Sequence, residues 1–169
     1  MGVVCGIAVV ALVGFIIGFA AKKKQKAPAE YDERQEAVRG RGFKYGYVAL
    51  AVYLAVYILL DALEINWCHT GAGLCLGIFI SLTVFVVYCI YKDAYFTVSD
   101  RPGFYVILFA VLSAVNLGCG LVIPDLKGME ADPLLGIEDV NFMVAGFLFI
   151  ILVNVLVKLW IDKRTGEME

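Results

Sequence analysis

Five long apolar segments alternate with polar segments along the 169-residue chain. Each apolar segment has about the 20 residues that an α-helix needs to cross the roughly 30 Å hydrocarbon core of a bilayer. We therefore expect an all-α polytopic membrane protein, a five-helix transmembrane bundle that forms a single membrane domain over residues 1–169. The predicted spans are residues 3–21, 45–63, 72–91, 104–123 and 140–161.

The composition also favours a membrane location. Hydrophobic residues make up 62% of the chain and charged residues 18%, and the mean hydropathy is +0.85. A soluble core of this size could not bury so much apolar surface. The chain has no long basic tail and no interleaved aromatic and basic residues. We therefore expect the lipid bilayer as a partner and no binding of nucleic acid.

Two polar segments differ in charge, and this difference predicts the topology. Residues 22–44 hold eight of the fourteen Lys and Arg residues, whereas residues 124–139 are acidic and contain one base, Lys127. Basic segments tend to stay on the cytosolic side of a membrane. We therefore expect a cytosolic basic connector at 22–44 and an acidic outer loop at 124–139. The N-terminus is then outside and the C-terminus cytosolic.

The connector carries a motif that leads into the second apolar segment. It reads YDERQ at residues 31–35, RG at 39–40 and FKYG at 43–46. This segment resembles the juxtamembrane segment of small uncharacterised multi-pass membrane proteins of Gram-positive bacteria. The resemblance covers about sixteen residues. It implies a multi-pass protein of the bacterial plasma membrane and carries no activity with it.

Residue spacing gives further expectations for the cytosolic ends of the spans. Residues 30–39 favour a short cytosolic helix ahead of the second span, and Gly40 and Gly42 are too weak a signal for a phosphate-binding loop. Tyr31 and Val38 share one face of that helix, which suits contact with the lipid headgroups or, alternatively, an ordinary solvated connector. Lys158 lies near the end of the fifth span, where a lysine is expected to snorkel toward the headgroups.

Polar residues in or beside the spans are candidate ligand-binding residues. Three of them recur every four positions on the second span and therefore share one face. Ionised groups are costly in hydrocarbon, so such residues are functional candidates by default. The alternative places the two acids in the headgroup layer and uses the asparagine for helix contact. The candidate polar face comprises Tyr53, Tyr57, Asp61, Glu64 and Asn116.

Cysteine and histidine placement offers little catalytic chemistry. Cys68 and Cys75 are candidate outer thiols, and a bridge between them would close a small loop around His69. The chain has no C-x-x-C motif, and its one histidine with irregularly spaced cysteines is a weak metal signal. With one histidine the chain has no haem-type histidine pair, and we recognise no Ser-His-Asp set or paired catalytic carboxylates in it. We expect no enzymatic activity, no cofactor and no metal.

Three classes of function remain. The first is a non-enzymatic accessory, regulatory or oligomer-forming subunit that acts through helix packing with a partner protein or a second copy. The second is a component of a small-molecule or ion transporter or channel, and the third is a membrane thiol oxidoreductase. The small and polar faces of the spans, such as the one that holds Ser113 and Asn116, favour the first class.

Overall fold

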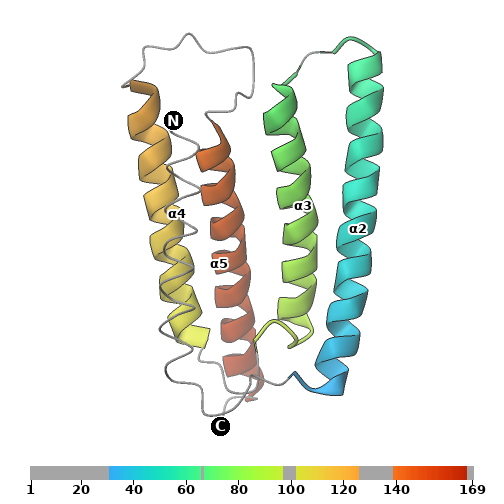
Figure 1. Cartoon of the computed structure of the whole chain (residues 1–169). Coiled ribbons are helices and arrows are strands. Elements are labelled where there is room, and N and C mark those ends of the chain that lie inside the picture. Colours follow the sequence, from blue (N-terminus) through green and yellow to red (C-terminus); the bar gives the residue numbers. More distant parts are fainter. Residues whose placement is uncertain (1–30, 66, 97–101, 126–138, 167–169) are drawn as a thin grey trace.

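The computed structural model describes residues 31–65, 67–96, 102–125 and 139–166, which form four long α-helices (Figure 1). All four are long and apolar enough to cross a membrane, and none of the described residues forms a strand. The all-helical class is therefore confirmed for the described residues, and the four helices fit the predicted membrane location. The predicted first span, at residues 3–21, lies outside the described residues. The helices are α2 (Glu33–Ala62), α3 (Thr70–Tyr91), α4 (Pro102–Asp125) and α5 (Val140–Thr165).

The first described helix differs from its prediction. α2 runs without a break from Glu33, so residues 33–44 belong to the same helix as residues 45–62 and do not form a separate connector helix. A capping box starts α2: the Asp32 side chain accepts from the backbone of the first turn, and the Gln35 side chain accepts from the Asp32 N–H. Gly40 and Gly42 lie inside the helix. Gly42 is buried against α3, and this packing offsets its low helix propensity, whereas Gly40 is exposed and has nothing within 4 Å of its Cβ position.

The four helices stand side by side in the order α2, α3, α5, α4, as Figure 1 shows. Among the described helices, α2 packs only against α3, and α4 packs only against α5. The contact between α3 and α5 joins the two pairs. The described helices therefore form an open row with α2 and α4 at its edges, and not a closed bundle.

Two kinds of packing hold the row together. Large apolar side chains from α3, α4 and α5 form its buried core, and glycines bring α2 and α3 close together. A Cβ atom at Gly46 would lie 3.0 Å from the Ser81 backbone oxygen, and one at Gly77 would lie 2.6 Å from the Tyr53 ring. The core residues are Val86, Ile90, Phe109, Leu148, Ile151 and Val155.

Charge is sorted along the helix axes. Every Lys and Arg among the described residues lies in the half of the row that contains the start of α2 and the end of α3. We call this the basic end. The opposite end contains Asp61 and Glu64 and is called the acidic end. The basic residues are Arg34, Arg39, Arg41, Lys44, Lys92, Lys158, Lys163 and Arg164.

Candidate functional site

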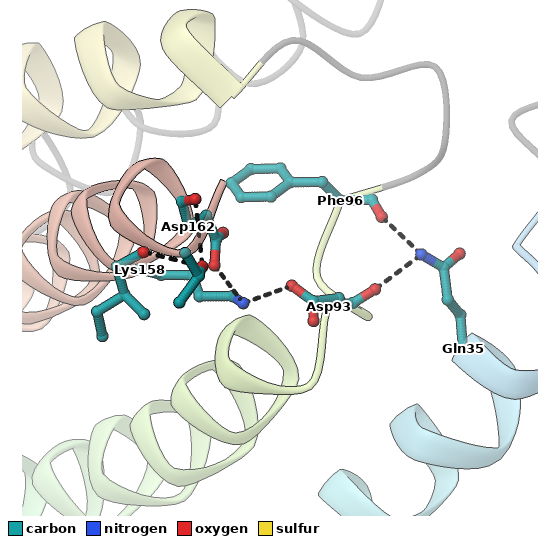
Figure 2. Close-up of polar contacts among 7 residues, drawn as sticks. Gln35, Asp93, Phe96, Lys158 and Asp162 are labelled. Atoms are coloured by element: carbon teal, nitrogen blue, oxygen red, sulfur yellow. Dashed lines mark hydrogen bonds and ion pairs between the residues drawn. The ribbon is translucent and has the colours of Figure 1, made fainter. Parts of the chain in front are cut away.

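Three segments that are distant in the sequence meet at the basic end, as Figure 2 shows. They are the first turns of α2, the residues that follow α3, and the last turns of α5. Their polar side chains form a connected set, which we call the polar junction. Its members are Gln35, Arg39, Asp93, Lys158 and Asp162.

Lys158 lies at the centre of the polar junction. Its Nζ is 3.0 Å from Oδ1 of Asp93 and donates to Oδ1 of Asp162 at 2.7 Å. Only 16% of the Lys158 side chain is exposed, so its ammonium has exchanged water for two carboxylates. Lys158 was expected to snorkel toward the headgroups, and in the structure its ammonium is paired with two carboxylates of the protein. Carboxylates at this distance stabilise an ammonium that has left water.

Asp93 is placed by the way α3 ends. Its backbone has φ 55°, the left-handed conformation that usually follows a helix end and is usually taken by glycine. The Asp93 N–H donates to the Ile90 carbonyl at 3.2 Å, and the Ala94 N–H donates to the Cys89 carbonyl at 2.9 Å. These two bonds make a Schellman motif. The motif turns the chain so that the Asp93 carboxylate meets Lys158.

α2 holds the same turn from the other side. Nε2 of Gln35 donates to the Asp93 carbonyl at 2.8 Å and to the Phe96 carbonyl at 3.2 Å. Nη1 of Arg39 reaches the Ala94 carbonyl at 3.5 Å. Asp93 is therefore held by α2 through its backbone and by α5 through its side chain. The polar junction thus links α2 to α5, two helices that do not pack against each other.

The motif at residues 31–46 has a clear structural role. Asp32 and Gln35 form the capping box that starts α2, and Gln35 also binds the turn after α3. The Arg39 guanidinium lies over the Tyr31 ring, 4.2 Å from its centroid. At the end of the motif, Gly46 accepts a hydrogen bond of 2.8 Å from the Ser81 hydroxyl of α3. These residues fasten the start of α2 to α3 and to the turn beyond it.

A cavity of about 240 Å³ lies beside the ion pairs. Its polar lining comes from Asp93, Lys158 and Asp162 of the polar junction. Burial raises the pKa of Tyr95, a residue of its wall, to about 12, so this phenol stays protonated at neutral pH. The apolar and aromatic lining consists of Ile90, Tyr95, Phe96, Val155 and Leu159.

The two tyrosines predicted on the polar face of α2 point toward α3. The Tyr53 hydroxyl donates to the Gly73 carbonyl at 2.7 Å. The Tyr57 ring stacks on that of Tyr53 with centroids 6.1 Å apart. Asp61 is exposed and lines a small pocket of about 40 Å³. Glu64 is also exposed, in the turn after α2. The tyrosines thus serve the contact between α2 and α3, and the two acids lie at its margin.

Asn116 is placed far from this group. It is buried on α4, where its Nδ2 donates to the Leu112 carbonyl of the same helix at 2.8 Å. Its neighbour Ser113 donates to the Ala145 carbonyl of α5 at 3.0 Å. Because α2 and α4 occupy opposite edges of the row, the structure does not bring Asn116 together with Tyr53, Tyr57, Asp61 and Glu64.

The candidate outer thiols lie at the acidic end. Cys68 and Cys75 are free. Burial raises the pKa of the Cys68 thiol, and a hydrogen bond from Tyr57 partly counters this effect. A thiol with a raised pKa is a poor nucleophile at neutral pH. Among the described residues, no three His, Cys, Asp or Glu side chains are grouped so that they could hold a metal ion.

Sequence reasoning missed the polar junction as a site. Gln35 belonged to the motif but had no assigned partner, and Asp93 carried no expectation. Lys158 and Asp162 are four residues apart on one helix, a spacing that favours an ion pair and was visible in the sequence. No sequence pattern connects Asp93 to this pair, because its carboxylate arrives from another helix end.

Comparisons of the chain with protein-family models, with curated proteins and with solved structures find no match. The chemistry of the polar junction therefore follows from its own residues. They supply two carboxylates, one ammonium, one guanidinium and one amide. Such a set fixes helices relative to one another and attracts charged groups.

Proposed function

We propose that this chain is a non-enzymatic integral protein of the bacterial plasma membrane that acts through helix association, as an oligomer-forming subunit whose partner is a second copy. The observation that supports this proposal is the open row of helices. α2 and α4 each pack against one described helix only, so within the described part of the chain each edge has a long lateral face. A small membrane protein with such edges has surface for further helix contacts.

The lateral face of α4 suits close approach of another helix. Ala110, Ala114 and Gly118 recur every four residues and are all exposed. A Cβ atom at Gly118 would meet nothing within 4 Å. In a bilayer, helices associate through van der Waals packing, and stripes of small residues let their backbones come near. A stripe of this kind can pack on its own copy about a twofold axis, which is the commonest symmetry of homo-oligomers.

The proposed orientation places the basic end in the cytoplasm. All described Lys and Arg residues lie at that end, and cytosolic loops carry an excess of such residues. Every copy inserted in this way has the same direction. Two copies of α4 therefore run parallel across a twofold axis normal to the membrane, and their small stripes lie at the same depth.

Association can be measured by energy transfer between donor-labelled and acceptor-labelled copies in liposomes, over a range of protein-to-lipid ratios. We expect wild type to associate, and Gly118→Leu to weaken this association by on the order of tenfold, because the leucine holds the two backbones apart. Gly146→Leu is the matched control, since this glycine of α5 is also exposed and also has open space around it. Wild type that stays monomeric at every ratio, or equal association of both variants, contradicts the proposal.

A further inference from the structure

We propose that the cavity beside the polar junction binds a small organic ammonium group that carries an apolar chain. Two sources have this chemistry: a soluble alkylamine and the aminoethyl headgroup of a phospholipid. The inference rests on the cavity and its lining and does not depend on the association of two copies. Four features of the cavity support it: its charge, its walls, its size and the backbone that presents Asp93.

The charge of the lining favours a cation. Asp93 and Asp162 share one ammonium, that of Lys158, at 3.0 and 2.7 Å. With both carboxylates ionised, the lining has a net charge of −1, and Lys158 is the only described base within it. The Asp93 side chain is 55% exposed, so a ligand can reach its carboxylate. A second ammonium can thus make a charge-assisted hydrogen bond that Lys158 does not already occupy.

The walls of the cavity suit the rest of such a ligand. Tyr95 and Phe96 contribute aromatic rings, whose faces attract cations. Ile90, Val155 and Leu159 contribute an apolar surface for a methylene chain. The volume of about 240 Å³ is below the ~300–1,000 Å³ of pockets that hold drug-sized ligands. The cavity therefore has room for a headgroup or a short chain.

The backbone at Asp93 indicates that its carboxylate is held for its position. This residue has φ 55°, where glycine would fit with less strain. Gln35 of α2 fixes its carbonyl at 2.8 Å, and Lys158 of α5 fixes its carboxylate. Contacts with two helices thus fix both the backbone and the side chain of Asp93. The carboxylate is thus aimed at the cavity before any ligand arrives.

Hexylammonium and hexanol are the first probes, because they share one chain and differ in charge. With the full chain in a non-ionic detergent, we expect hexylammonium to raise the thermal unfolding midpoint in a concentration-dependent way and hexanol to leave it unchanged. Hexyl sulfate serves as the anionic control. Equal shifts with hexanol, or a larger shift with hexyl sulfate, overturn the proposal.

Two matched variants locate the site. Asp93→Asn keeps the size of the side chain and tolerates the same backbone conformation, and it should weaken hexylammonium binding about tenfold through the loss of one charged hydrogen bond. Glu64→Gln makes the same kind of change at the equivalent turn after α2 and should leave binding unchanged. If Asp93→Asn binds hexylammonium as tightly as wild type, the assignment of the binding site to this cavity is overturned. Asp162→Asn gives an independent second test of hexylammonium binding, because the Asp162 carboxylate lies on another helix.

Lipid retention distinguishes the two sources. The protein is extracted from nanodiscs that contain phosphatidylethanolamine, phosphatidylglycerol or phosphatidylcholine, and native mass spectrometry detects the lipid that stays bound. Retention of phosphatidylethanolamine that is lost in Asp93→Asn identifies a lipid headgroup as the ligand. Hexylammonium binding without lipid retention identifies a soluble amine. Preferential retention of phosphatidylglycerol that survives in Asp93→Asn contradicts the proposal.

Discussion

The ends of α2 and α3 have the same backbone geometry and different roles. Each helix ends in a Schellman motif with an acidic residue in the left-handed position, Glu64 at φ 59° and Asp93 at φ 55°. Glu64 is exposed at the acidic end, whereas Asp93 is tied to α2 and α5 at the basic end. The same Schellman motif can therefore simply end a helix, as at Glu64, or connect several helices, as at Asp93. The difference depends on whether side chains of other helices contact the turn.

The two ends of the row also differ in what holds α2 to its neighbours. At the acidic end, α2 meets α3 through tyrosine rings and the hydrogen bond from Tyr53 to Gly73. At the basic end, Gln35 and Arg39 add hydrogen bonds to the turn after α3, and Lys158 extends the connection to α5. We therefore expect polar substitutions to affect stability more at the basic end.

Removal of the Lys158 ammonium should have the largest effect. Lys158→Met keeps the aliphatic stem and leaves the Asp162 carboxylate, whose side chain is 17% exposed, without its partner. We expect a loss of about 2 kcal/mol in unfolding free energy, below the ~3–5 kcal/mol of a fully buried pair because Asp93 is half exposed. Thermal unfolding in detergent measures the change. Lys163→Met, at an exposed position of the same helix, should change stability by less than about 0.5 kcal/mol. Equal losses in the two variants would show that the junction does not stabilise the fold.

Alanine substitutions at Gly46 and Gly40, two glycines of the motif at residues 31–46, should have opposite effects on stability. Gly46→Ala places a Cβ atom 3.0 Å from the Ser81 backbone oxygen, so α2 and α3 must separate, and we expect a loss of about 1–2 kcal/mol. Gly40→Ala meets nothing within 4 Å and should gain about 0.5–1 kcal/mol, because alanine favours the helix. Thermal unfolding of the two single variants tests this difference in sign. A gain in both would mean that Gly46 does not set the helix spacing.

Glycine substitutions at Glu64 and Asp93 test whether the ends of α2 and α3 have different roles. Glu64→Gly removes backbone strain and no ion pair of the described structure, so it should stabilise the protein by about 0.5–1 kcal/mol. Asp93→Gly removes the same strain together with the contact to Lys158, so its net effect should be near zero or destabilising by up to about 1 kcal/mol. The informative quantity is the difference between the two variants in thermal unfolding. If both are stabilised equally, the Asp93 ion pair contributes nothing to the fold.

The sequence predicts the helices well where apolar runs are uninterrupted. α3, α4 and α5 cover the predicted spans at 72–91, 104–123 and 140–161. The continuity of α2 was not predicted: residues 30–39 and 45–63 were expected to form two separate helices, whereas one helix runs from Glu33 to Ala62. The capping box at Asp32 and Gln35 was present in the sequence, but only contact with α3 and the turn after it shows that the helix continues from there.

The sites were harder to predict because they depend on the order of the helices. The four-residue spacing correctly places Tyr53 and Tyr57 on one face of α2, yet nothing local shows that this face meets α3. Asn116 and the tyrosines are at opposite edges of the row, which only the helix contacts reveal. The polar junction likewise needs Asp93 and Lys158 to meet across two helices.

The smallest expected effect concerns the reactivity of Cys68 at the acidic end. Burial raises the pKa of this thiol, and the hydrogen bond from Tyr57 lowers it by a lesser amount. Alkylation by iodoacetamide, followed by mass spectrometry of the peptide that carries Cys68, should therefore accelerate only above the pH at which an exposed thiol, with a pKa near 8.5, reacts. Tyr57→Phe removes the bond that favours the thiolate, so the pKa rises and the rate profile moves to still higher pH. A Tyr57→Phe profile that moves to lower pH, or fast labelling of wild type at neutral pH, would show that Cys68 is an activated thiol. Either result would support the thiol oxidoreductase hypothesis.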